Sequence, residues 1–116
     1  MGEQVFSDIT VVDLTRGIAG PYCTKLLASF GAEVIKVENP GEGDVTRSMG
    51  PFPDDEFNLE KSGLYFYLNT NKKSVTLNLH SDRGIQICKK LLGTADILVE
   101  SFAPGRLARL GLVEQP

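Results

Sequence analysis

GIAGPYCTKLLASFGAEVIKVE, residues 17–38, predicts a glycine turn, a helix, a second glycine turn and a β-strand, in that order. Pro21 suits the first turn of a helix, where its missing N–H costs no hydrogen bond. Gly31 suits the left-handed position at which many helices end. The β-branched run ITVVDL, residues 9–14, precedes the first turn and is typical of a strand buried on both faces. Together these segments predict a β-α-β unit with parallel strands.

The helix in this unit carries an apolar stripe at spacings of three and four residues, which predicts the face that packs on the sheet. The stripe consists of Tyr22, Cys23, Leu26, Leu27 and Phe30. We expect Cys23 and the later Cys88 to be buried core thiols, because both lie at apolar helical positions without the spacing of metal ligands. Unpaired thiols favour a reducing compartment, so we expect a cytoplasmic protein.

The chain continues with a long irregular segment and further regular elements. Residues 39–63 are rich in glycine, proline and acidic residues, and they predict a long loop of the kind that is functional or mobile. VTLNL, residues 75–79, alternates apolar and polar side chains, which predicts a half-buried strand.

Three more elements follow residue 80. Ser81 or Asp82 can cap a helix that ends at Gly93, with an inner stripe of Ile85, Cys88, Leu91 and Leu92. Residues 96–100 predict another buried strand, and residues 104–111 a short helix. The alternation of strands and helices predicts an α/β protein with an open parallel sheet and helices packed on it.

Length and charge exclude several other classes. The chain has 116 residues and a formal net charge of -3, which suits one small domain rather than two. It has no basic run, so we expect no nucleic-acid partner. No apolar run approaches the roughly 18 residues that a membrane span needs, so we expect no membrane partner.

The carboxyl ends of the predicted strands are where an open parallel sheet binds ligands. Three segments meet there: Thr15 to Gly20, Glu38 with Asn39, and Glu100 to Phe102. The first offers backbone N–H groups at a helix start, which suit an anion. Glu38 lies about where dinucleotide folds place the acid that binds a ribose. Because a single Gly-x-x-Gly is a weak signal, nucleotide binding and a purely structural turn both remain open.

Several cations near these ends could bind phosphate or simply be solvated. They are Arg16, the adjacent Lys72 and Lys73, and Arg106 with Arg109, which lie three residues apart. His80, the only histidine, is expected to be exposed. No Ser-His-Asp set can be assembled, and we expect no metal site. Asp13, Asp44 and Asp96 have structural interpretations, as residues at strand ends or in a turn.

Two blocks of sequence closely resemble class III CoA-transferases, the CaiB/BaiF or formyl-CoA transferase family. They are VVDLTRGIAGPYCTKLLASFGAEVIKVENPGEGDVTR, residues 11–47, and YFYLNTNKKSVTLNLHSDRGIQICKKLLGTADILVESFAPGRLARLGL, residues 65–112. The resemblance implies a Rossmann-like, mainly parallel sheet that is incomplete relative to the family fold, with residues 1–116 as the N-terminal part of a CoA-binding domain. It also implies that coenzyme A moves between carboxylic acids through an acyl-aspartyl intermediate, in an interlocked homodimer.

The resemblance further implies which residues bind acyl-CoA. Arg16, Gly17, Ile18 and Ala19 would line the pantetheine and thioester end. Asn39, Leu77, His80, Ser101, Phe102 and Arg109 would surround the adenine and its phosphates.

This sequence departs from the family at three of these positions, and the resemblance implies that the catalytic aspartate lies outside it. Many relatives have a basic residue at Asn39, and several have lysine at His80 or asparagine at Ser101. The family's catalytic aspartate lies beyond these residues, so we expect the chain alone to be inactive. Two alternatives remain open: a non-catalytic CoA-binding or interaction module, and a fragment of an acyl-CoA racemase.

Overall fold

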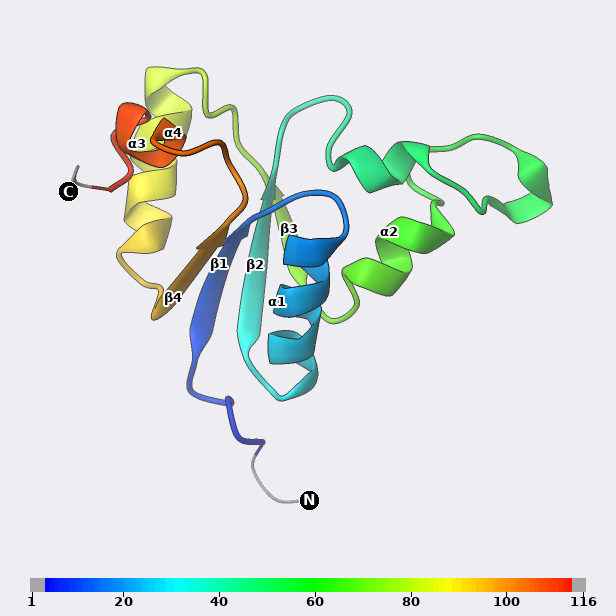
Figure 1. Cartoon of the computed structure of the whole chain (residues 1–116), viewed down its shortest axis with the longest axis horizontal. Helices are drawn as coiled ribbons and strands as arrows, with labels where there is room; N and C mark the ends of the chain where they lie inside the picture. The colour runs from blue at the N-terminus through cyan, green and yellow to red at the C-terminus, as the bar shows by residue number, and fades with distance from the viewer. Residues whose placement is uncertain (1–3, 114–116) are drawn as a thin grey trace.

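The centre of the computed structural model, which describes residues 4–113, is a sheet of four parallel strands (Figure 1). The strands are β1 (Thr10–Leu14), β2 (Glu33–Glu38), β3 (Lys73–Thr76) and β4 (Ile97–Glu100). They lie in the order β3-β2-β1-β4, so β1 and β2 are central. Val12 lies beside Ile35 of β2 and Leu98 of β4. The prediction of an open parallel sheet in an α/β fold is confirmed.

Helices cover both faces of this sheet. Helix α1 (Ala19–Ser29) packs on one face, and α3 (Asp82–Leu92) with the short α4 (Arg106–Arg109) packs on the other. The core on the α1 side contains Val11, Ala28, Ala32 and Val34. The core on the α3 side contains Val12, Leu14, Val37, Leu79, Cys88 and Leu112. Neighbouring residues of β1 therefore face opposite layers, as the two-residue period of a strand requires.

The face that α1 presents to the sheet differs from the prediction. Its buried residues are Pro21, Thr24 and Ala28, whereas Tyr22, Leu26 and Phe30 are 43%, 42% and 56% exposed. Cys23 is exposed as well, and only Leu27 of the predicted stripe packs partly against the core. Small residues at the interface bring α1 close to the sheet, and the Thr24 hydroxyl donates to the buried Asp13 at 2.6 Å. The apolar pattern therefore predicted the wrong face of α1. The face with Thr24 packs on the sheet, where its hydroxyl bonds to Asp13.

Helix α3 matches its prediction. Ser81 caps it by accepting a hydrogen bond from the backbone N–H of Gly84 at 3.0 Å. Cys88 is buried, and Ile85, Leu91 and Leu92 pack around it. The helix ends before Gly93, as expected.

The two edge strands are more exposed than the sequence suggests. The third strand was expected at residues 75–79 but spans Lys73–Thr76, and all four of its residues are exposed. Leu77 and Leu79 follow it and turn into the α3-side core. Strand β4 was expected to be buried, yet Ile97 and Glu100 are exposed. Both strands lie at sheet edges, where one neighbour is missing.

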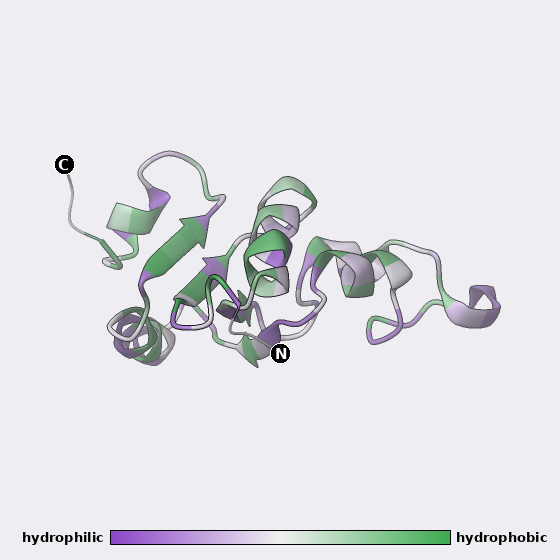
Figure 2. Ribbon diagram, turned by 90° about the horizontal axis from the view of Figure 1, so that it is seen from below, coloured by the Kyte–Doolittle hydropathy of each residue, from purple (hydrophilic) through white to green (hydrophobic). Residues whose placement is uncertain are grey.

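The segment 39–63 contains short helical turns rather than a featureless loop. It includes the 3-10 helices η1 (Val45–Ser48) and η2 (Pro53–Asp55), and it leads into α2 (Gly63–Leu68), which the sequence analysis did not predict. Ser62 caps α2 by accepting from Tyr65 N at 3.1 Å. The part around η2 extends to the right of the sheet in Figure 1, and its tip is hydrophilic in Figure 2. Mobility of this segment remains a prediction.

Candidate functional site

A pocket opens at the carboxyl ends of β1 and β2, and Phe102 and Arg106, which follow β4, form part of its lining. Its lining combines apolar and charged side chains: Leu14, Thr15, Arg16, Lys36, Val37, Glu38, Asn39, Gly43, Asp44, Leu79, Phe102 and Arg106. This is the edge at which ligand binding was predicted. A second, wider hollow is lined by Arg16, by Asn39 and the glycine turn that follows it, and by Phe57 and Leu59 further along the segment 39–63.

A buried ion pair joins the two loops that border the pocket. Lys36 Nζ lies 2.7 Å from Asp44 Oδ2, with side chains 1% and 0% exposed, and it also donates to the Thr15 carbonyl oxygen at 3.0 Å. The other carboxylate oxygen of Asp44 accepts from the N–H groups of Gly17, at 3.3 Å, and Thr46, at 2.9 Å. Burial alone would raise the pKa of Asp44, but the bonds from Lys36 and Thr46 outweigh it and lower that pKa.

A second buried ion pair lies next to the turn that joins β1 to α1. Lys72 Nζ meets Asp13 Oδ2 at 3.1 Å and donates to the Pro21 carbonyl oxygen at 3.0 Å. Asp13 also accepts from the backbone N–H of Thr15 and the hydroxyl of Thr24. Burial lowers the pKa of Lys72 to about 8 against the opposing charge of Asp13. Lys72 is therefore a structural residue and not a solvated turn residue or a phosphate ligand.

Glu38 is the centre of a third polar cluster. Its carboxylate forms a two-point contact with Arg47, at 2.8 and 2.9 Å. It also accepts from the Tyr65 hydroxyl, the Ser74 hydroxyl and the backbone N–H of Asp44. Burial would raise the pKa of Glu38, but these donors lower it to about 2. Five hydrogen bonds from protein groups already occupy the two carboxylate oxygens of Glu38, which favours a structural role over a ribose contact.

The structure brings some of the predicted ligand residues together in the pocket and leaves others outside its lining. Arg16, Asn39 and Phe102 line the pocket. The Ser101 hydroxyl lies next to Arg16 and accepts from its backbone N–H at 3.3 Å.

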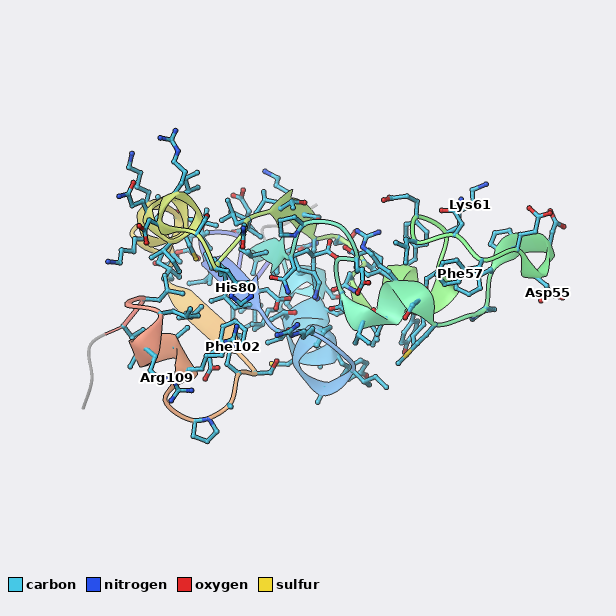
Figure 3. The ribbon with its side chains drawn as sticks, turned by 90° about the horizontal axis from the view of Figure 1, so that it is seen from above. Asp55, Phe57, Lys61, His80, Phe102 and Arg109 are labelled. Atoms are coloured by element: carbon cyan, nitrogen blue, oxygen red, sulfur yellow. The ribbon has the colours of Figure 1, made fainter. Side chains whose placement is uncertain are left out.

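The remaining predicted residues lie outside the pocket lining. Gly17 is half-buried, and Ile18 and Ala19 are exposed at the start of α1. His80 is exposed, as predicted, while Leu77 is half-buried in the α3-side core. Figure 3 shows His80, Phe102 and Arg109 on the same side of the molecule, far from Asp55 and Lys61 of the segment 39–63.

Sequence reasoning missed several residues that build this pocket. Leu79 lines it, and Lys36 and Asp44 form its floor. One signal was present for Lys36, because it is a single charge inside the apolar run 33–38. A buried lysine of this kind requires a buried partner. The sequence showed no sign that Asp44, in the glycine turn after β2, would be that partner.

Replacing Gly20 with alanine is expected to lower the free energy of unfolding by about 1 to 3 kcal/mol, the usual cost of overpacking. An added Cβ would lie 2.4 Å from Cβ of the buried Thr15. The measurement is urea unfolding. Gly20 lies in the first turn of α1, so helix propensity alone would favour alanine, and a gain in stability would contradict the expectation.

Two further findings concern membranes and metals. Within residues 4–113, no helix combines the length and apolar character that crossing a bilayer requires. The same residues contain no group of three or more His, Cys, Asp or Glu side chains placed to hold a metal ion.

Comparisons with known proteins agree with this architecture. Over 104 residues the chain is 45% identical to a succinyl-CoA:glutarate CoA-transferase of Mus musculus, covering 90% of this chain and 23% of that protein. Over 109 residues it is 47% identical to a formyl-CoA:oxalate CoA-transferase of Rhodopseudomonas palustris, covering 93% of this chain and 24% of that protein. The chain therefore spans about a quarter of the length of the curated relatives it matches.

Solved structures show the same likeness. A CaiB/BaiF family protein from Brucella suis superposes with a TM-score of 0.84 at 33% identity, covering 97% of this chain and 29% of that one. A protein from Mycobacterium tuberculosis superposes with a TM-score of 0.82 at 34% identity, covering 95% and 28%. Residues 6–115 match the profile described as CoA-transferase family III. The chain belongs to CoA-transferase family III.

Proposed function

We propose that this chain is the CoA-binding segment of an enzyme that transfers coenzyme A between carboxylic acids. The observation that carries the proposal is the pocket at the carboxyl ends of β1 and β2. It combines an apolar wall of Leu14, Leu79 and Phe102 with the charged groups of Arg16 and Arg106. A nucleotide is complementary to this pocket, because it carries an aromatic ring for the apolar wall and negatively charged phosphate groups for the arginines.

The proposed contacts follow the order of the ligand. Arg16 and the turn Gly17 to Ala19 would contact the pantetheine and thioester end. Asn39, Leu77, His80, Ser101, Phe102 and Arg109 would contact the adenosine end and its phosphates. The common position of Asn39 and Phe102 in one pocket supports the proposed contact with the adenosine end.

The proposed chemistry is nucleophilic catalysis by an aspartate carboxylate. The carboxylate attacks the thioester carbonyl carbon, the C–S bond breaks, and coenzyme A leaves as the thiolate while an acyl-aspartyl anhydride forms. Asp13 and Asp44 cannot act in this way because both are buried in ion pairs. Asp96 accepts from the Thr10 N–H at the opposite end of β1. The family resemblance implies that the nucleophile lies outside residues 4–113, and we propose that this chain alone does not complete the transfer.

Two properties of the whole protein belong to the same proposal. The family resemblance supports an interlocked homodimer. A cytoplasmic location is supported by Cys23 and Cys88, both of which are free thiols.

Titration of the purified protein with coenzyme A tests the proposed function. We expect binding with a Kd below about 1 mM, measured by calorimetry. Transfer between an acyl-CoA and a carboxylic acid is then measured by chromatography of the CoA esters, with and without the remainder of the protein. Absence of binding would refute the proposal. Binding without transfer in the whole protein would identify a non-catalytic module, and exchange of the α-proton would identify a racemase.

A further inference from the structure

The charges around the pocket are not all equally available to a ligand. Lys36 and Asp44 are paired with each other at 2.7 Å, and Glu38 is paired with Arg47. Neither Arg16 nor Arg106 forms a side-chain hydrogen bond or an ion pair with any residue between 4 and 113. The pocket therefore has an excess of positive charge from two guanidinium groups.

Arg106 stands out because part of its guanidinium is out of contact with water. Its Nε is buried and has no hydrogen-bond partner among the described residues. The guanidinium carbon lies 5.3 Å from the centre of the Phe102 ring. A buried donor without an acceptor costs free energy, which is the arrangement expected of a group that receives its partner with the ligand.

Arg109 has a different position, although it is only three residues away on α4. It is exposed, and its Nη1 lies 3.2 Å from where a Cβ on Gly105 would be. It does not line the pocket, whereas Arg106 does. Of the two arginines, only Arg106 lines the pocket, and Arg109 is exposed outside that lining.

We propose that Arg106 binds a phosphate group of the coenzyme A substrate. This inference rests on the proposed function and adds a ligand residue to that site. Phosphate oxygens would accept from Nε and from a terminal N–H, in the two-point geometry that guanidinium groups favour. Asn39 also lines the pocket and carries no charge, so Arg106 and Arg16 supply the positive charge that the pocket has available.

The test compares the binding of coenzyme A to the purified wild-type protein and to the Arg106→Gln variant. We expect the variant to bind about tenfold more weakly or worse, because a charge-assisted contact is lost. Arg106→Lys keeps the charge but not the two-point geometry and is expected to bind with intermediate affinity. Lys90→Gln, on the exposed surface of α3, is the control and should bind like the wild type. Thermal unfolding establishes that each variant is folded.

The outcomes separate this inference from the proposed function. A loss of affinity for coenzyme A but not for dephospho-coenzyme A would support contact with the 3′-phosphate, and equal losses would support contact with the diphosphate. Wild-type binding that Arg106→Gln leaves unchanged would overturn the role of Arg106 alone. Absence of binding by the wild type would overturn both.

Discussion

Replacing Lys72 with alanine is expected to lower the free energy of unfolding by about 3 to 5 kcal/mol, the cost of leaving a buried charge without its partner. The side chains of Lys72 and Asp13 are 1% and 0% exposed and meet at 3.1 Å. Alanine would also remove the donor to the Pro21 carbonyl oxygen and to Asn69. Urea unfolding at neutral pH measures the difference.

The neighbouring lysine provides a matched control. Lys73 is 72% exposed and pairs with Glu33 at 2.8 Å on the surface of the sheet. Such exposed pairs contribute less than about 1 kcal/mol, so Lys73→Ala should change stability little. Equal losses in the two variants would contradict the assignment of Lys72 to the core. A double variant, Asp13→Val with Lys72→Met, should be less destabilised than the two single changes summed, since no charge is left unpaired.

These adjacent lysines illustrate what the sequence could not resolve. Both lie in one polar segment, and the choice between a solvated turn and a phosphate site was left open for the pair. The buried partner of Lys72 is Asp13 of β1, which lies 59 positions away in the sequence. Local composition carries no information about a partner at that distance.

The elements themselves were predictable because their signals are local. The β-branched runs gave the central strands, and Ser81 marked the start of α3. The side of α1 that faces the sheet was predicted wrongly, because Thr24 bonds to a buried carboxylate while Tyr22 and Leu26 stay outside. The spacing of apolar residues cannot show that the buried carboxylate of Asp13 would bring the threonine face of α1 against the sheet.

The candidate site was predictable in its location but only partly in its membership. Parallel strands place their carboxyl ends at one edge, so Arg16, Asn39 and Phe102 were expected near one another, and they line one pocket. Whether Arg106 or Arg109 lines the pocket depends on the direction of one helical turn. That direction follows from the left-handed Gly105 at the start of α4 and was not evident from spacing.

Replacing Glu38 with glutamine is expected to lower the free energy of unfolding by about 3 kcal/mol, because Arg47 would lose its buried counter-charge. Glu38 joins β2 to β3 through Ser74, to α2 through Tyr65, and to the turn at Asp44. Glutamine has nearly the same size, so the change isolates the charge and the acceptor capacity. Urea unfolding at neutral pH is again the measurement.

The pH dependence gives this prediction a second, independent readout. The pKa of Glu38 is lowered on folding from its ordinary value of 4.5 to about 2, so the unfolded state binds the proton more tightly. The contribution of Glu38 is therefore complete above about pH 4.5 and is lost as the pH falls toward 2. Glu38→Gln should flatten the wild-type loss of stability over this range. Glu60 is the control, because its side chain is 83% exposed and its Oε2 lies 3.6 Å from Nη1 of Arg47, the arginine that also pairs with Glu38. Glu60→Gln should keep the wild-type dependence of stability on pH. If Glu38→Gln retained that profile as well, the carboxylate would not be the group whose ionisation holds β2, β3 and α2 together.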